Sequence, residues 1–310
     1  MKAVRYHRYG DADVLVHEEA DRPVPGPGQV LLRVAATSFN PVDAQIRAGL
    51  LQQAYPLTLP HTPGIDAAGT VEELGDDVEG WAEGDPVVAF LPLGAPGAAA
   101  EFVLVPAALL TAAPTTIALA DAAALPAPGL TAWQALFDHA ALVPGQTVLV
   151  NGGGGAVGGY AVQLAAHAGA AVTATAGPAS AERLRAFGAS HLVDYTEAPL
   201  AEAAGERYDV VLNLVPTGPA DSAALTGLVA DDGVLVSATT PAPEDQARGV
   251  RALRMFARSD AAQLAALVAR IDAGDLTVDV EARRPLADLP ALHTEYASGT
   301  RLGRTVITVP

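Results

Sequence analysis

Hydrophobic residues follow two different patterns along the chain, and the change falls near residue 122. Before it, short β-rich runs are separated by glycine and proline clusters such as residues 23–28, which predicts a small, barrel-like antiparallel domain. The predicted strands of this part are residues 30–35, 69–73, 86–90 and 101–105.

After residue 122, apolar strands alternate with helical segments, which predicts a parallel sheet covered by helices. The predicted strands are 147–151, 171–176, 191–194, 208–214, 233–238 and 251–258, and the helices are 158–168, 179–187 and 260–271. The tail, 276–310, returns to short strands that we expect to rejoin the first domain. The chain is therefore predicted to be an α/β protein with one domain formed by 1–121 and 275–310 and another by 122–274.

A glycine-rich turn follows the first strand of the second domain, and Gly153, Gly155 and Gly158 satisfy G-x-G-x-x-G. One glycine makes the tight turn, one lets the backbone approach a pyrophosphate, and one lets the helix pack on the sheet. The helix N-terminus then offers N–H groups to the phosphates. A glycine-rich loop without a ligand is the alternative, but the flanking strand, helix and second strand favour a dinucleotide site.

The second strand ends in Thr175-Ala176-Gly177, without the acidic residue that holds the ribose of NAD. Small and hydroxyl-bearing residues leave room for a 2′-phosphate, so we expect NADPH rather than NADH. Arg183, Arg185 and Tyr195 are candidates to contact that phosphate; alternatively, the two arginines face solvent. A methyltransferase, which also uses such a turn, would need the missing acid.

The amino-acid composition argues against several classes of partner and chemistry. With 35 acidic and 18 basic residues, the net charge of −17 disfavours a nucleic-acid partner. Cysteine is absent, which excludes thiolate chemistry, and Lys2 is the only lysine, which excludes a P-loop lysine. Prolines and acidic residues interrupt the most apolar region, 91–136, so we expect no membrane span. The charged N-terminal residues lack a signal-peptide pattern, so we expect a cytoplasmic protein.

Several motifs together resemble the medium-chain dehydrogenase/reductase superfamily, specifically its zinc-free quinone oxidoreductase (zeta-crystallin-like) branch. They cover nearly the whole chain and are T-S-F-N-P-V-D at 37–43, P-G-I-D-A-A-G-T-V at 63–71, G-W-A-E-G-D-P-V at 80–87, G-L-T-A-W at 129–133, G-A-S-H-L-V-D-Y at 188–195, and Gly299 with Gly303-Arg304. The resemblance implies a GroES-like β-barrel catalytic domain, a Rossmann NADPH-binding domain, and a homodimer formed through the edge strand near 250–258. The cofactor contacts that it implies are Asn40, Thr131, Gly152, Gly153, Gly155, Ala156, Val157, Gly158, Thr175, Ala176, Arg183, Tyr195, Leu214 and Arg304.

Zinc-dependent relatives carry a cysteine where this chain has Asn40, and Gly-His-Glu where it has Gly64-Ile65-Asp66. We therefore expect no catalytic metal, and we interpret His61 as a loop histidine. Without a Lewis acid, the acceptor must already be electrophilic, as quinones and α,β-unsaturated carbonyls are.

By the same resemblance, Asn40 is the candidate to donate to the oxyanion that develops on the acceptor; a structural role before Pro41 is the alternative. Asp43 is the second candidate of the catalytic loop, as a brace rather than a base. Gln45, Leu51 and Tyr55 are candidates to line the substrate pocket. Gln45 replaces a tyrosine of some relatives, which leaves three functions open: a quinone reductase, an enone or enoyl reductase, and a non-catalytic NADPH-binding protein.

Overall fold

The computed structural model describes residues 1–197, 200, 204–300 and 303–310, and the chain divides into two compact units. Unit 1 comprises Met1–Ala127 and Ser259–Pro310, and unit 2 comprises Pro128–Arg258. The predicted α/β class is confirmed. The second boundary differs from the predicted residue 275, because helix α8 (Ala261–Asp272) packs on unit 1. There the Ala261 carbonyl accepts a hydrogen bond from Thr111, and the Asp272 carboxylate accepts the backbone N–H groups of Thr115 and Thr116.

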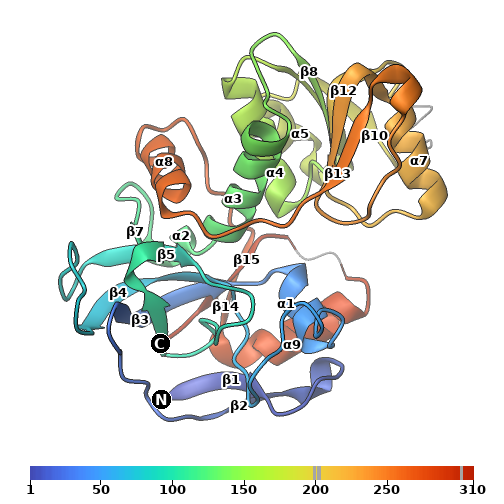
Figure 1. Ribbon diagram of the computed structural model, residues 1–310. Coiled ribbons are helices and arrows are strands. Elements are labelled where there is room, and N and C mark those ends of the chain that lie inside the picture. Colours follow the sequence, from blue (N-terminus) through green and yellow to red (C-terminus); the bar gives the residue numbers. More distant parts are fainter. Residues whose placement is uncertain (198–199, 201–203, 301–302) are drawn as a thin grey trace. The chain divides into compact units, whose positions relative to one another are not determined.

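Unit 1 is built on a seven-stranded sheet in which the order is β14-β15-β3-β4-β5-β7, and β6 pairs with β3 (Figure 1). All pairs are antiparallel except β14 with β15. The side chains of Val30, Leu32 and Val34 alternate into the apolar core, as the period of a strand requires. The strands are β3 (Gln29–Ser38), β4 (Asp66–Leu74), β5 (Pro86–Phe90), β6 (Phe102–Pro106), β7 (Thr111–Ala112), β14 (Ala282–Pro285) and β15 (Thr305–Thr308).

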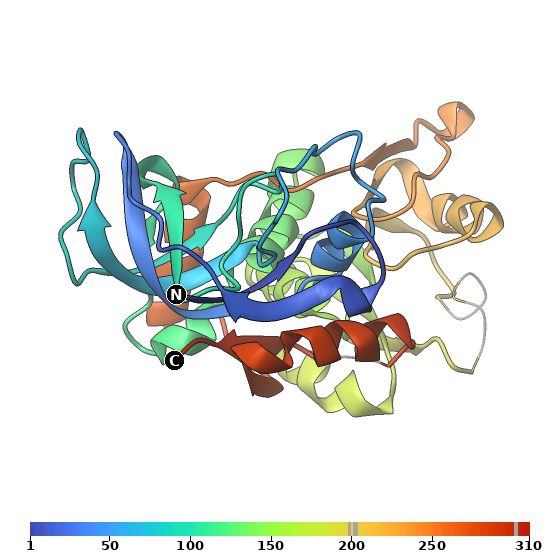
Figure 2. The same cartoon turned by 90° about the horizontal axis from the view of Figure 1, so that it is seen from below.

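A hairpin of β1 (Lys2–Tyr6) and β2 (Leu15–Glu19) completes unit 1, together with short helices α1 (Pro41–Arg47) and α2 (Leu119–Ala122). The tail differs from the prediction of strands alone, because it also contains helix α9 (Leu289–Ala297). Leu289, Leu292 and His293 are buried at helical spacing, so this face packs on the unit rather than alternating. Figure 2 shows α9 beside the β1–β2 hairpin, with which it is in contact.

Unit 2 is a parallel six-stranded sheet with the order β10-β9-β8-β11-β12-β13. The chain moves outward from β8 to β10, returns to β11 beside β8, and then moves outward the other way, so the order reverses between β8 and β11. In such sheets, ligands bind at the carboxyl ends of the strands at this reversal. The strands are β8 (Thr147–Asn151), β9 (Ala171–Ala176), β10 (His191–Asp194), β11 (Tyr208–Asn213), β12 (Val229–Ser237) and β13 (Arg251–Arg254).

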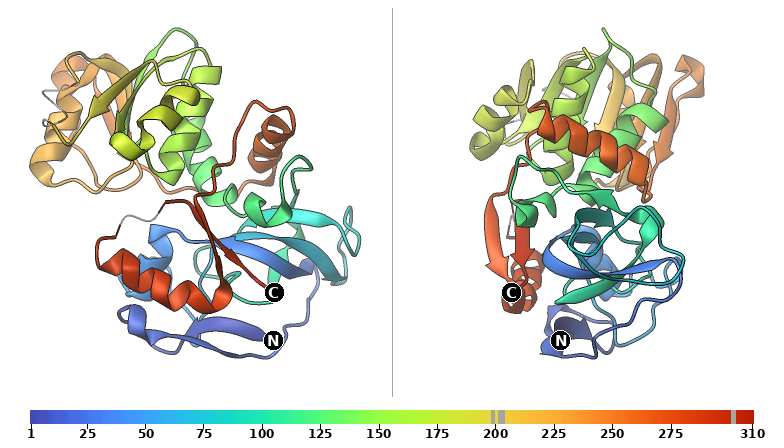
Figure 3. Two further views of the ribbon diagram at one scale, coloured as in Figure 1. Left: turned by 180° about the vertical axis from the view of Figure 1, so that it is seen from behind. Right: turned by 90° about the vertical axis from the view of Figure 1, so that its left-hand side faces the viewer.

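The helices of unit 2 cover this sheet as the alternating pattern predicts. Helices α4 (Ala156–His167) and α5 (Pro178–Ala186) pack against β8, β9 and β10, and α7 (Pro219–Gly227) packs against β12 (Figure 3). Helix α3 (Pro126–Trp133) and a π-helical segment (Gln134–His139) precede β8. In the described part of the chain, no helix has the length and apolar character needed to cross a membrane.

Candidate functional site

The glycine turn lies at the carboxyl end of β8, at the strand-order reversal. Gly152 follows the last residue of β8 with φ +96°, a conformation that favours glycine. Gly153 and Gly158 are needed for packing: a Cβ at Gly153 would be 2.9 Å from the Ala174 Cβ, and one at Gly158 would clash with the Gly152 carbonyl oxygen. The tight turn thus depends on Gly152, while Gly153 and Gly158 let the turn and α4 approach the sheet.

Gly155 is the exposed glycine at the start of α4. Within the described residues, a Cβ at Gly155 would have one neighbour closer than 4 Å, the Gly152 oxygen at 3.4 Å. No side chain of these residues caps α4, and its first turn, which contains Ala156 and Val157, carries no acid. This open position leaves the helix N-terminus available to an anion, which fits the pyrophosphate of a dinucleotide. The φ of Gly155 is −83°, so the backbone at this position does not itself require glycine.

The end of β9 braces the turn from beneath. Thr175 and Ala176 are buried, and the Thr175 hydroxyl accepts a hydrogen bond from the Gly152 N–H at 2.8 Å. The structure therefore places the Thr175 side chain against the turn. Leu214 lies there too, because a Cβ at Gly152 would be 3.1 Å from the Leu214 Cβ. Thr131, another predicted cofactor contact, lies half-buried on α3.

Arg183 lies beside the glycine turn, and Tyr195 lies beside Gly177 at the end of β9. Arg183 Nη2 donates to the Gly154 carbonyl oxygen at 2.9 Å, and the Tyr195 hydroxyl would be 3.2 Å from a Cβ at Gly177. Arg185 lies on the same helix and is exposed, so this arginine faces solvent, as the alternative for the two arginines stated. Sequence reasoning missed Ser180, whose hydroxyl accepts from the Gly177 N–H at 3.3 Å. The sequence could have indicated this contact, because a serine in the first turn of the helix after β9 can hydrogen-bond the backbone at the helix start.

A buried polar cluster occupies unit 1 around Asp66, the first residue of β4. Asp66 is 0% exposed, and its carboxylate accepts hydrogen bonds from Asn40 Nδ2 at 2.7 Å, from the Ala127 N–H at 2.6 Å and from the Ser38 hydroxyl. Arg304 Nη2 lies 3.6 Å from the same carboxylate. Burial raises the pKa of Asp66, and the Arg304 charge and these hydrogen bonds oppose that rise.

Asn40 and Arg304 are engaged within this cluster. The Asn40 side-chain oxygen accepts from Arg304 Nη1 at 3.5 Å, and Arg304 also donates to the Ala124 carbonyl oxygen. Because Asp66 and Arg304 hold both ends of the Asn40 amide, this arrangement favours the structural role of Asn40 over donation to an acceptor. Arg304, predicted to contact the cofactor, lies here as the partner of Asp66.

Asp43 braces the segment that leads into β4. One carboxylate oxygen accepts from the Gly64 N–H at 3.0 Å, and the other accepts from the Asn40 N–H at 3.3 Å. Burial raises the pKa of Asp43 to about 7, and the nearby negative charge of Asp66 adds to that rise. Both carboxylate oxygens are therefore used to hold backbone, as expected for a brace.

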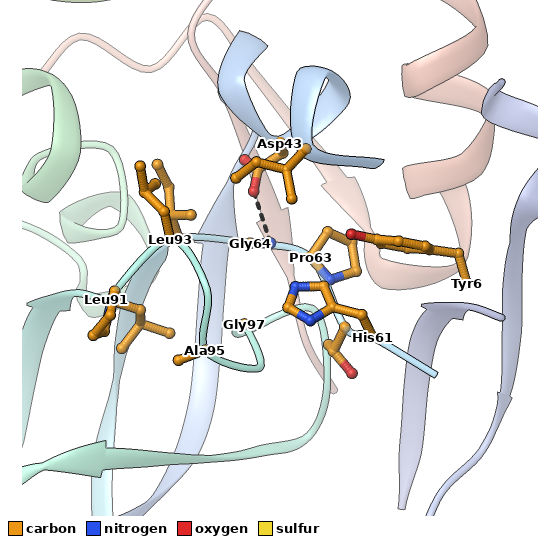
Figure 4. A pocket seen from close by; sticks show the side chains of 13 residues that line it. Tyr6, Asp43, His61, Pro63, Gly64, Leu91, Leu93, Ala95 and Gly97 are labelled. Carbon is orange, nitrogen blue, oxygen red and sulfur yellow. Dashed lines mark hydrogen bonds between the residues drawn. The ribbon is translucent and has the colours of Figure 1, made fainter. Parts of the chain in front are cut away.

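A small cavity of about 10 Å³ lies next to Asp43, with His61, Tyr6 and Leu91 among the residues lining it (Figure 4). This volume admits roughly one water molecule and is too small for a quinone. His61 is a buried loop residue 5.4 Å from the Tyr6 ring, and burial lowers its pKa to about 4. The predicted pocket residues Gln45, Leu51 and Tyr55 do not line this cavity; they lie on α1 and the turn after it, where the Tyr55 N–H donates to the Leu51 oxygen at 2.9 Å.

The described side chains around Asp66 are not arranged as a set of zinc ligands. The chain has no cysteine, and donors already surround the Asp66 carboxylate. Among the described residues, no group of three or more histidine, aspartate or glutamate side chains is arranged to hold a metal.

Two family models match parts of the chain. Residues 26–115 match the alcohol dehydrogenase GroES-like domain, and residues 187–307 match the zinc-binding dehydrogenase family. The chain is 40% identical over 222 residues to a chloroplast envelope quinone oxidoreductase homolog of Arabidopsis thaliana, covering 69% of this chain and 68% of that protein. It is 37% identical over 228 residues to the 2-methylene-furan-3-one reductase of Solanum lycopersicum, covering 70% and 58%. A mycobacterial protein solved in complex with NADPH has a similar structure, with a TM-score of 0.85, 30% identity, and coverage of 99% of this chain and 100% of that one.

Proposed function

We propose that this chain, which belongs to the medium-chain dehydrogenase/reductase superfamily, reduces quinones with NADPH and without a metal ion. Family membership makes it an oxidoreductase with a dinucleotide cofactor. The observation that carries the proposal is the open turn at Gly155, which leads from β8 into α4 at the strand-order reversal.

The preference for NADPH follows from the residues around the end of β9. The backbone N–H groups of residues 156 and 157 would hold the pyrophosphate, since they begin a helix whose first turn contains no acid. Arg183 and Tyr195 would hold the 2′-phosphate, because Arg183 contacts the turn, Tyr195 lies beside Gly177 at the end of β9, and an arginine pairs strongly with phosphate. The end of β9 lacks the acidic residue that would accept a hydrogen bond from the ribose 2′-hydroxyl of NADH.

The class of acceptor follows from the chemistry of unit 1. NADPH, when bound, supplies the hydride, and an acceptor reduced without a Lewis acid must delocalise the incoming charge itself. A quinone does so, and the name of the Arabidopsis chloroplast envelope relative, a quinone oxidoreductase homolog, supports this acceptor. An enone does so as well, and the tomato reductase supports that second candidate.

Cofactor preference is tested first, by titrating NADPH and NADH into the wild-type chain and into Arg183→Ala. We expect wild type to bind NADPH more tightly, and Arg183→Ala to weaken NADPH by roughly tenfold or more while NADH changes little, because a charge-assisted hydrogen bond to the 2′-phosphate is lost. Arg185→Ala, an exposed arginine on the same helix, is the matched control and should match wild type. Equal or tighter binding of NADH by wild type would refute the preference.

Acceptor class is tested by following NADPH oxidation with a series of quinones and a series of enones. Faster turnover of quinones supports the primary proposal, and faster turnover of enones supports the second candidate. Cofactor binding without turnover of any acceptor would instead indicate a non-catalytic NADPH-binding protein.

A further inference from the structure

A row of polar side chains crosses the parallel sheet of unit 2 at its carboxyl edge. Asn151 on β8 is in register with Asn213 on β11, and Asn213 with Ser237 on β12. On the other side, the pairing of Val150 with Ala174 puts Asn151 beside Thr175 on β9. We call Thr175, Asn151, Asn213 and Ser237 the polar row; their exposed fractions are between 0% and 8%.

Hydrogen bonds join the polar row from one strand to the next. The Thr175 hydroxyl donates to Asn151 Oδ1 at 3.4 Å, Asn151 Nδ2 donates to Asn213 Oδ1 at 2.9 Å, and Asn213 Nδ2 donates to the Ser237 hydroxyl at 3.2 Å. The donors therefore all point the same way, from β9 through β8 and β11 to β12. Four strands are connected by side chains in addition to the backbone ladder.

The polar row also holds two loops at the carboxyl edge of the sheet, the glycine turn after β8 and the loop after β11. At β9, the Thr175 hydroxyl accepts the Gly152 N–H of the glycine turn. At β11, Asn213 Oδ1 accepts the Val215 N–H at 3.4 Å, and the Thr239 hydroxyl donates to the Val215 oxygen at 2.7 Å. A Cβ at Gly152 would be 3.0 Å from Val215 Cγ1, so the glycine turn and the loop after β11 are in contact.

The polar row is costly to bury unless every group is paired. An amide transferred to an apolar environment loses its water hydrogen bonds, and the neighbouring residues of these strands are valine, leucine and alanine. Apolar residues at the same positions would pack without any need for hydrogen-bond partners. Once paired, the donors and acceptors allow one arrangement of the four side chains, and this fixes the two loops that they hold.

We propose that the polar row positions the glycine turn and the loop after β11 relative to each other before a cofactor binds, with Asn213 as its central positioning residue. The inference rests on the proposed function of the turn as a dinucleotide site. A dinucleotide spans the strand-order reversal, with its adenosine half on the β9 side. The loop after β11 then serves the other half, so the polar row sets whether both halves are bound together.

The test compares two ligands on Asn213→Ala and wild type. The first ligand is NADPH, and the second is adenosine 2′,5′-bisphosphate, which has only the adenosine half. We expect Asn213→Ala to weaken NADPH binding by between about tenfold and about a hundredfold, since small misplacements of positioned groups have effects of this size. Binding of the adenosine ligand should change by less than about threefold, because Arg183 and Tyr195 lie on the β9 side.

Thr147→Val is the matched control, because Thr147 links the same two strands at their amino ends. Its hydroxyl donates to the Asp209 carboxylate at 2.9 Å and accepts the Asp209 N–H at 3.0 Å. This variant should lose stability but bind both ligands as wild type does. Asn151→Ala and the double variant with Asn213→Ala complete a cycle, in which the loss of NADPH affinity should be less than additive.

Three results would contradict the inference. If Asn213→Ala bound NADPH like wild type, the polar row would not position the site. If it weakened both ligands equally, or if Thr147→Val had the same effect, the row would only stabilise the unit. A wild-type chain that bound neither ligand would overturn the proposed function and therefore the inference. This result is distinguishable from the other three, because they concern the variants and it concerns wild type.

Discussion

The Asp66 carboxylate and the Arg304 guanidinium lie 3.6 Å apart inside unit 1, with 0% and 5% of their side chains exposed. The pair connects the start of β4 to the residue before β15, and Asn40 contacts both members. A buried charge without a partner is strongly unfavourable, so each residue makes the burial of the other possible. The guanidinium thus supplies the positive charge beside the Asp66 carboxylate and the Asn40 amide.

Replacing Arg304 tests this pairing. We expect Arg304→Met to lower the free energy of unfolding by about 3–5 kcal/mol, because it leaves Asp66 buried without its countercharge. Adding Asp66→Asn should recover part of the loss, since the unpaired charge is then removed. Urea unfolding of the two variants and wild type measures both effects, and a loss below about 1 kcal/mol for Arg304→Met would show that the pair is not required.

Two valine substitutions separate ligand exclusion from packing in the glycine turn. Gly155→Val should abolish NADPH binding with little change in melting temperature, because its φ of −83° suits valine and the side chain would occupy the open side of the turn. Gly158→Val should lower the melting temperature by roughly 5 °C or more, because its side chain clashes with the Gly152 oxygen. Calorimetry and fluorescence titration of both variants provide the data. NADPH binding at wild-type strength by Gly155→Val would refute the placement of the phosphate site.

The zinc-free proposal predicts that activity is independent of metal. Elemental analysis of the purified protein should find no stoichiometric zinc, and treatment with a chelator should leave NADPH oxidation unchanged. The reason is the donor set, which lacks cysteine and has a closed network around Asp66. One zinc per chain, with activity that a chelator removes, would contradict this proposal.

Asp43 predicts a pH dependence of stability. Its pKa is raised from 3.8 to about 7 in the folded chain, so the folded state favours the protonated carboxyl group. The protonated Asp43 adds at most about 4 kcal/mol to the free energy of unfolding. This contribution is fully present below about pH 4 and is lost as pH rises through about 7. Asp43→Asn removes this titration. Urea unfolding from about pH 4 to about pH 8 should show wild type losing stability relative to Asp43→Asn, and parallel curves would contradict the prediction.

We expect a homodimer that forms through β13. In the described residues, β13 pairs with β12 on one side and is an edge of the sheet, and Phe256 just beyond it is 52% exposed. An open edge is commonly paired, and two-fold contacts are the usual solution. Light scattering at micromolar concentration should show a dimer that Phe256→Glu weakens. A monomeric wild-type chain would contradict this expectation.

Local patterns in the sequence determined most of the fold. The two hydrophobic periods predicted strands β3 to β6 and all six strands of unit 2, because alternation along a strand and the apolar stripe of a helix are properties of neighbouring residues. The β1–β2 hairpin and helix α7 were not predicted, and in the tail Leu289, Leu292 and His293 form a helical face that the sequence pattern did not reveal. The spacing of Gly153, Gly155 and Gly158 likewise predicted the tight turn between β8 and α4, since such a turn depends on a short stretch of chain.

Pairing between distant residues was decided by the tertiary structure alone. Arg304 was expected to contact the cofactor, and the fold also pairs it with Asp66, because β15 and β4 both pair with β3. The polar row has a partial signal, since three of its four members end strands β8, β11 and β12. Its pairing required the strand order β9-β8-β11-β12, which depends on the non-local crossovers of the chain. Hydrogen bonds between residues far apart in sequence form only after the core has fixed the strand register, and that is why no local pattern specified them.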